Sequence, residues 1–395
     1  MPETDRPAYS FDGGAPPEVR NFLANKGVRP SFSWLDVEPE EHAVAFTVAK
    51  AMQADILQDI RDAVQEAIDT GQTFESFQKE LRPKLAEKGW WGKRQMIDPA
   101  DGEAREVQLG SPRRLRTIYR ANLRSANMAG KWDRVQRTKR TFPYLEYRTG
   151  PSERHRPHHK AKEGWVLHVD DPFWKTWWFP NGWGCKCWAL QLTQEQAEAR
   201  GITQNPYIPT RTFENARTGE LKQVPQGIDP GWESNPGLVR QQAMEKMLRD
   251  KLETADPMVA EVVARDIATS WRVQRLLAGE ATGSAPVAVL SQRLKDALGA
   301  ETQLVGVNDR TVTKWQEKSR PVTPEVMRAV TDGIKAAEAW TQTRNGETDL
   351  ILRSAGWFIA LRHIREKAEV WIRTMHPVDD AQWARKIAQA DRKVE

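Results

Sequence analysis

The residues best suited to chemistry are two cysteines and a nearby group of histidines. Cys185 and Cys187 are the only cysteines of the chain, and in a strand residues two apart present their side chains on the same face. A disulfide is hard to form at that spacing, whereas a shared metal ion is easier. With His159 as a third ligand and His155 or His158 as a fourth, the sulfurs could hold a structural zinc ion.

Two other interpretations use the same residues. Cys185 and Cys187 could be an ordinary pair of buried free thiols, or one of them could be a nucleophile with His159 as its base, as in a cysteine protease. The sequence has no phosphate-binding glycine loop, no HExxH motif and no nucleophile elbow. With two cysteines there is also no disulfide framework, which favours a reducing compartment.

The segment 113–162 is strongly basic, with fifteen Lys or Arg residues against three acids. Such an excess predicts an anionic neighbour, which could be DNA, RNA or an acidic protein surface, although a solvated helix face has the same composition. The candidate cations lie in the predicted helix 112–140: Arg113, Arg114, Arg116, Arg120, Arg124, Lys131, Arg134 and Arg137.

Four dissimilar strings occur in a fixed order along the chain, at residues 154–159, 171–174, 180–187 and 227–232. In this order they resemble the Mu F-like head morphogenesis family of tailed bacteriophages, over roughly residues 30–240. Ser152 stands where an acid is usual, and Lys186 replaces the usual Arg. The motif residues are Arg154, Arg156, His159, Asp171, Trp174, Pro180, Asn181, Cys185 and Cys187.

The resemblance implies a minor head protein that acts in procapsid assembly and in DNA packaging or ejection. Its expected place is the interior of the virion head, after assembly in the host cytoplasm. The implied partners are the portal protein, the scaffold or the major capsid protein, and packaged DNA is a further candidate. For Arg154 and Arg156 we expect either phosphate contacts or a salt-bridge network with Asp170 and Asp171.

The patterning predicts an α+β protein with several domains. Of 395 residues, 39% are hydrophobic and 29% are charged, and no stretch approaches the roughly 20 apolar residues of a membrane span. The N-terminus lacks the pattern of a signal peptide. The expected parts are a flexible arm (1–30), a Mu F-like domain (31–192), a wrapping linker (193–240), a helical connector (241–286) and a C-terminal α+β domain (287–395).

Apolar periodicity predicts the elements that position these residues. Helices are expected at 39–70, 74–88, 112–140, 239–253 and 256–278, and a loop or weak hairpin at 90–110. Short strands are expected at 144–147, 165–168 and 187–190, in a small irregular region rich in tryptophan.

The segment 287–395 predicts a separate domain with helices at 287–298, 324–341 and 379–392 and an antiparallel meander at 349–353, 356–362 and 368–373. This order resembles the barnase, colicin and RelE-like nucleases, which implies a virion-delivered, metal-independent ribonuclease or effector as the alternative function. His363 would be its catalytic residue, among cations such as Arg353, Arg362 and Arg373. Since the histidine usual in the first helix is missing, a descendant without enzymatic activity is the preferred interpretation.

Overall fold

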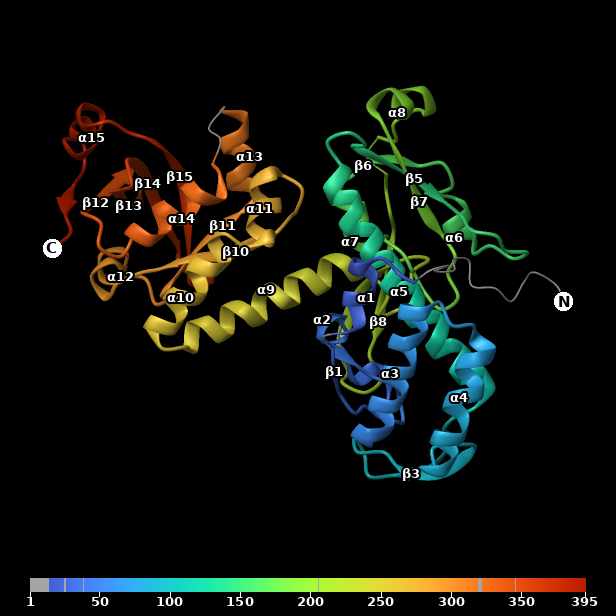
Figure 1. Ribbon diagram of the computed structural model, residues 1–395. Helices are drawn as coiled ribbons and strands as arrows, with labels where there is room; N and C mark the ends of the chain where they lie inside the picture. The colour runs from blue at the N-terminus through green and yellow to red at the C-terminus, as the bar shows by residue number, and fades with distance from the viewer. Residues whose placement is uncertain (1–13, 25, 38, 205, 319–321, 345) are drawn as a thin grey trace. The chain divides into compact units, whose positions relative to one another are not determined.

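The computed structural model describes residues 14–395 apart from 25, 38, 205, 319–321 and 345, and it has the predicted α+β architecture (Figure 1). The chain forms two compact units, Met1–Ala243 and Met244–Glu395. Within the described residues, no helix is both long and apolar enough to cross a membrane.

The first part of the N-terminal unit is a helical layer. Its helices are α1 (Pro17–Ala24), α3 (Ala54–Thr70), α4 (Phe74–Glu87) and the basic helix α5 (Pro112–Thr138). The side chains of Thr73 and Ser111 cap the N-termini of α4 and α5, and Gly71 ends α3 with φ 69°. The apolar stripe of α3 packs into a shared core with α1, α4 and α5. The predictions for α4 and α5 are confirmed.

Two predictions at the start of the chain are wrong. The segment 39–70 is not one helix: α2 (Pro39–Val44) and the short strand β2 (Ala45–Phe46) precede α3. Lys50, with φ 68°, interrupts the helical path, and Phe46, Val48 and Ala51 are buried from non-helical backbone instead. Residues 1–13 of the predicted arm lie outside the described residues. From Pro17 onward the arm is helix α1 and strand β1 (Gly27–Val28), which pairs with β2.

The predicted hairpin is present as β3 (Lys93–Ile97) and β4 (Ala104–Gln108). After α5, the described residues form a three-stranded antiparallel sheet in the order β6-β5-β7, with β5 at Tyr144–Arg148, β6 at Val166–His168 and β7 at Trp188–Leu192. Two one-turn helices, α6 (Pro157–Lys160) and α7 (Phe173–Thr176), lie in its connections. Trp174, Trp177 and Trp178 are fully buried beside it.

The segment predicted as a wrapping linker contains regular elements. These are α8 (Gln194–Arg200), the hairpin of β8 (Thr210–Glu214) and β9 (Leu221–Pro225), and the start of α9 (Pro236–Thr254). Val224 and Ile228 join the tryptophan-rich core, so this segment closes over that core.

In the C-terminal unit, the described residues form a seven-stranded sheet in the order β10-β11-β15-β14-β13-β12-β16. The predicted antiparallel meander is confirmed as β13, β14 and β15, and β15 also pairs in parallel with β11. The strands are β10 (Ser284–Val289), β11 (Leu304–Asn308), β12 (Ala339–Arg344), β13 (Glu347–Ser354), β14 (Trp357–Ile364), β15 (Glu369–Pro377) and β16 (Arg392–Lys393).

Three predicted helices of this unit need correction. The segment 256–278 is two helices, because Ser270 caps a new one. The segments 287–298 and 324–341 each combine a strand with a helix, since a buried apolar strand such as β10 has no alternation that distinguishes it from a helix. The helices are α10 (Pro257–Ala268), α11 (Trp271–Ala278), α12 (Gln292–Leu298), α13 (Asp309–Glu317), α14 (Pro324–Gly333) and α15 (Asp380–Ile387).

Candidate metal site

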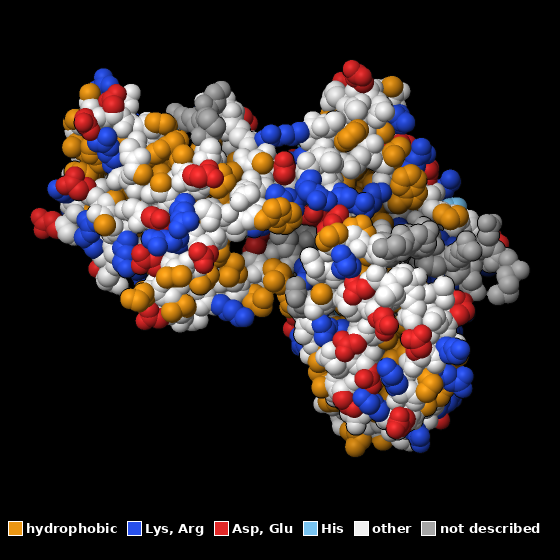
Figure 2. All heavy atoms as spheres, in the orientation of Figure 1, with side chains coloured by type: hydrophobic (Ala, Val, Ile, Leu, Met, Phe, Trp, Pro, Cys, Tyr) orange, Lys and Arg blue, Asp and Glu red, His pale blue; other side chains and the backbone are white. Residues whose placement is uncertain are grey.

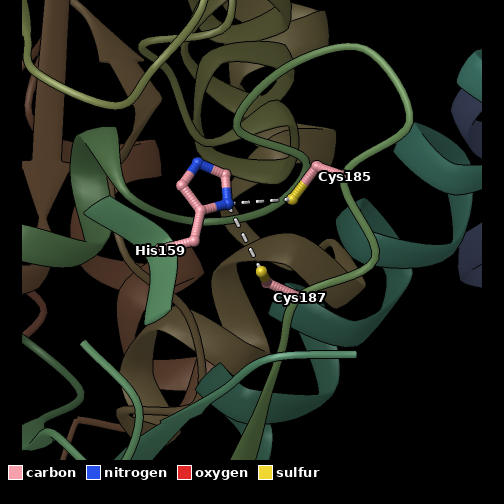
Figure 3. A group of neighbouring side chains, drawn as sticks. All are labelled: His159, Cys185 and Cys187. Carbon is pink, nitrogen blue, oxygen red and sulfur yellow. Dashed lines mark hydrogen bonds between the residues drawn. The ribbon is translucent and has the colours of Figure 1, made fainter. Parts of the chain in front are cut away.

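His159, Cys185 and Cys187 meet inside the tryptophan-rich part of the N-terminal unit (Figure 3). His159 lies on α6, and the cysteines lie just before β7, so the prediction that they belong to the strand is wrong. Nδ1 of His159 is 3.9 Å from Sγ of Cys185 and 3.5 Å from Sγ of Cys187. All three side chains are buried, with exposed fractions of 3%, 9% and 5%.

The imidazole of His159 is held in one orientation. Its Nε2 lies 2.7 Å from the carbonyl oxygen of Gly227. A carbonyl oxygen only accepts hydrogen bonds, so Nε2 carries a proton, and this bond directs Nδ1 at the two sulfurs. Histidine ligands of metal ions are oriented in this way by a carbonyl or carboxylate on the second nitrogen.

The pKa values of the two thiols are shifted in opposite directions. The pKa of Cys185 lies well below its usual value, first because Cys187 donates a hydrogen bond to its sulfur. The pKa of Cys187 is raised, because its proton is held by that bond and because burial disfavours a thiolate. The pair therefore carries negative charge more readily than an isolated buried thiol, which is the electrostatic condition for holding a cation.

The loops around the cluster are joined by Arg156 and Asp229. Oδ2 of Asp229 accepts hydrogen bonds of 3.0 Å from Nη2 of Arg156 and from the backbone nitrogen of Trp183. The prediction that Arg156 pairs with Asp170 or Asp171 is therefore wrong. Asp170 instead pairs with Lys139, and the Asp171 carboxylate accepts from the backbone nitrogen of Phe173.

Two glycines of the motifs are required by close packing. A Cβ at Gly182 would clash with Arg156 and Asp229, and a Cβ at Gly227 would lie 2.5 Å from Cβ of His158. Both glycines also have positive φ, at 150° and 101°. The first, third and fourth of the four strings thus fold against one another around the cluster. The fourth string was recognised in the sequence, but no role was predicted for Gly227 or Asp229 within it.

The remaining motif residues have structural positions around this core. Trp174 is buried and its indole nitrogen donates to His168 O at 3.1 Å. Asn181 is buried and donates to Trp178 O at 3.2 Å, and Pro180 precedes it in a buried turn. Arg154 is exposed. His155 and His158 are also exposed, so neither joins the metal-binding group, contrary to the prediction of a histidine as fourth ligand.

Much of the basic helix faces inward. Arg124 donates to the carbonyl oxygen of Cys187, and Lys131 donates to that of Ala189, where burial lowers the pKa of Lys131 to about 8. Arg114 donates to three backbone carbonyls, including that of Ala49. Arg134 and Arg137 pair with Glu18. Of the predicted anion-binding set, Arg113, Arg116, Arg120 and Arg134 are exposed.

A cysteine-nucleophile site is not supported by this geometry. The thiols are buried, and neither of two cavities of this unit is lined by His159, Cys185 or Cys187. A substrate in either cavity would not touch the sulfurs. The arrangement is suited to holding an ion rather than to turning over a substrate.

The C-terminal unit does not assemble the predicted nuclease residues. Arg362 and Arg373 both pair with the buried carboxylate of Asp349, while His363 follows Arg362 on β14 and so points to the opposite face of the sheet. Among the described residues, neither ring nitrogen of His363 has a hydrogen-bond partner. A histidine base with cations or an acid beside it is therefore not seen here.

Known proteins resemble the part of the chain that carries this cluster. A family model described as Phage Mu protein F like protein matches residues 58–190. Protein F of Escherichia phage Mu, whose name assigns it to capsid assembly, is 34% identical over 298 residues, covering 68% of this chain and 66% of that protein. The match thus spans slightly less than two thirds of the Mu protein.

A second relative is the FluMu F protein of a Mu-like prophage in Haemophilus influenzae. It is 40% identical over 172 residues, covering 44% of this chain and 40% of that protein. No solved structure matches the chain, and the nuclease-like fold of residues 287–395 stays a prediction. The four ordered strings, the family model and these relatives agree, and the chain belongs to the phage Mu F-like protein family.

Proposed function

We propose that the chain is a minor head protein that acts in capsid assembly of a Mu-like phage. The observation that carries this proposal is the similarity to a protein named for capsid assembly over 298 residues. The described structure supports a structural role: His159, Trp174, Cys185 and Cys187 of the family's motifs are buried in or beside one core and do not line the cavity described next. Its place would be the virion head, after assembly in the host cytoplasm.

For contact with a head partner we propose a cavity of about 440 Å³ in the N-terminal unit. Its floor is apolar and includes Phe46, Ile118 and Trp232. Its described lining also holds Lys26, Arg113, Arg114 and Lys222 but a single carboxylate, that of Glu233. This chemistry fits an apolar segment flanked by carboxylates, contributed by the portal, the scaffold or the major capsid protein.

Packaged DNA is a second possible contact, through the exposed Arg113, Arg116 and Arg120. Their spacing of three and four residues places them along one side of α5. The neighbouring surface does not extend this basic stripe: on the face shown in Figure 2, Lys or Arg and Asp or Glu side chains are mixed over α3, α4 and the β3–β4 hairpin. We therefore propose the partner cavity as the principal contact.

The test is to delete the gene from its phage and to supply the chain from a plasmid. Purified virions and empty procapsids are then analysed by quantitative mass spectrometry. A low, constant copy number in either particle, together with loss of infectious particles on deletion, supports the proposal. If the chain is absent from both particles, or if particle yield is unchanged on deletion, the proposal fails.

A further inference from the structure

We infer that His159, Cys185 and Cys187 bind a zinc ion whose role is to lock the motif loops onto helix α5. This inference concerns the stability of the unit and does not depend on the proposed role in capsid assembly. It follows from the type and spacing of the ligands, from the groups behind them and from their burial.

The ligand atoms already have the spacing of a tetrahedral site. Zinc lies about 2.3 Å from sulfur and about 2.0 Å from nitrogen, which places the nitrogen and each sulfur roughly 3.5 Å apart. The observed separations from Nδ1 are 3.5 Å to Cys187 and 3.9 Å to Cys185, and all three ligand atoms lie within 4.8 Å of one another. An ion could enter with movements of a few tenths of an ångström.

The groups behind the ligands favour bound thiolates. The backbone N–H of Asn181 donates to the sulfur of Cys185, and that of Gly150 donates to the sulfur of Cys187. The carbonyl of Gly227 fixes the ring of His159 from the other side. A Cβ at Gly150 would clash with Lys186, which explains why the donor there is a glycine. Such outer hydrogen bonds orient metal ligands and tune their basicity.

Two sulfurs and one imidazole nitrogen in a buried site favour zinc over magnesium or calcium, which prefer oxygen ligands. The three protein ligands leave one tetrahedral position. The hydroxyl of Tyr147 is buried next to Cys187 and has no hydrogen-bond partner among the described residues, so we assign the position to this hydroxyl or to a water that it holds. Because the described cavity does not reach the cluster, the ion would be structural and not catalytic.

Such an ion would connect segments far apart in sequence. It would tie α6 to the loop before β7, while Arg124 of α5 already holds the carbonyl of Cys187. The tryptophan-rich region has only short strands, and regions with few regular hydrogen bonds gain most from a metal cross-link.

The experiment measures zinc in the full chain, produced without a histidine tag in zinc-supplemented medium. Elemental analysis should find one zinc ion per chain in the wild type and in the His155→Asn/His158→Asn control, whose histidines are exposed. Cys185→Ser/Cys187→Ser and His159→Ala should lose the ion. Cobalt added to the chelated wild type should produce the intense absorption of a cobalt–thiolate bond, which needs no variant to fold.

Two results would overturn the inference. One is a folded wild-type chain that contains no stoichiometric zinc and gives no cobalt–thiolate absorption after supply of either ion. The other is retention of zinc by the double cysteine variant, which would place the ion elsewhere. Because neither readout involves phage particles, their failure is separable from failure of the proposed role in capsid assembly.

Discussion

The guanidinium of Arg124, in the middle of the basic helix α5, donates a hydrogen bond to the carbonyl oxygen of Cys187. Arg124 is 8% exposed, and the bond joins the longest helix of the N-terminal unit to the loop that carries the cysteines. A cation predicted to meet an anionic partner is therefore part of the frame of the candidate metal site.

Replacing Arg124 with Met should reduce the free energy of unfolding of the N-terminal unit by about 2–3 kcal/mol, because a buried carbonyl loses a charged donor. The matched control is Arg113→Met, an exposed position on the same helix, where we expect a change within about 0.5 kcal/mol. Urea unfolding followed by tryptophan fluorescence measures both. Equal midpoints for the two variants would contradict the structural role of Arg124.

Asp229→Ala should destabilise the same unit by about 1–3 kcal/mol. The change removes the acceptor shared by the half-buried Arg156 and the backbone nitrogen of Trp183. Asp170→Ala is the control, because its pair with Lys139 is on the surface and should contribute less than about 1 kcal/mol. If both variants have the wild-type unfolding midpoint, Asp229 does not hold the loops together.

Lys26 should make stability depend on pH. Burial, and secondarily Arg240, lowers its pKa from 10.5 to about 7, while its Nζ donates to the carbonyl of His42 and lies over the ring of Phe22. Between pH 7 and 10.5 the unfolded chain binds more protons than the folded chain, so the free energy of unfolding rises with pH through this window. This gain in the free energy of unfolding is lost as the pH falls to 7.

Between pH 7 and pH 10 the free energy of unfolding of the wild type should rise by up to about 3 kcal/mol relative to that of Lys26→Met. Urea unfolding at a series of pH values measures the difference. Lys79→Met, at an exposed position, should leave the wild-type pH profile unchanged. Parallel profiles for the wild type and Lys26→Met would show that Lys26 keeps an ordinary pKa.

The sequence predicted well where one physical signal determined the result. Helices α4 and α5 have amphipathic spacing together with capping residues, and the meander β13–β15 has short β-rich segments separated by turns. The prediction failed where the same residue spacing fits two different backbone structures. The four-residue spacing of Val44, Val48 and Met52 fits a helix, yet these residues lie at the end of α2 and in non-helical backbone before α3.

For the candidate site, the sequence predicted the three side chains that meet but not their surroundings, and their binding of zinc stays a prediction. His159, Cys185 and Cys187 were identified by residue type and spacing, because few side chains bind zinc. The fourth histidine and the partner of Arg156 were wrong, because tertiary packing determines which loop side chains meet. Asp229 follows Arg156 by 73 residues, and no local periodicity connects the two.

Filling the proposed partner cavity should block assembly without unfolding the chain. Ala121 of α5 lines the cavity and is partly exposed, so Ala121→Trp would occupy space that a partner side chain needs. We expect a loss of infectious particles on the order of tenfold or more, the effect of removing one well-buried interface contact. Plaque titres from complementation of the gene deletion measure it.

The control for this variant is Ala86→Trp on α4, an exposed position that does not line the cavity. Both variants should keep the wild-type unfolding midpoint within about 1 kcal/mol. Equal titres for the two variants would remove the cavity as the partner site, while leaving the similarity to capsid assembly proteins untouched.

The C-terminal unit offers the last test, because it separates a structural role from the nuclease alternative. Asp349 is buried and pairs with both Arg362 and Arg373, so Asp349→Ala should destabilise this unit by about 3–5 kcal/mol, because it removes the buried carboxylate that the two arginines share and leaves Arg362 only the exposed Glu347. His363→Ala should leave particle titre unchanged, since its ring contacts no described hydrogen-bond partner. Thermal unfolding and complementation measure the two effects. If His363→Ala abolished RNA cleavage or toxicity of the wild-type chain while particles stayed normal, the effector interpretation would replace the structural one.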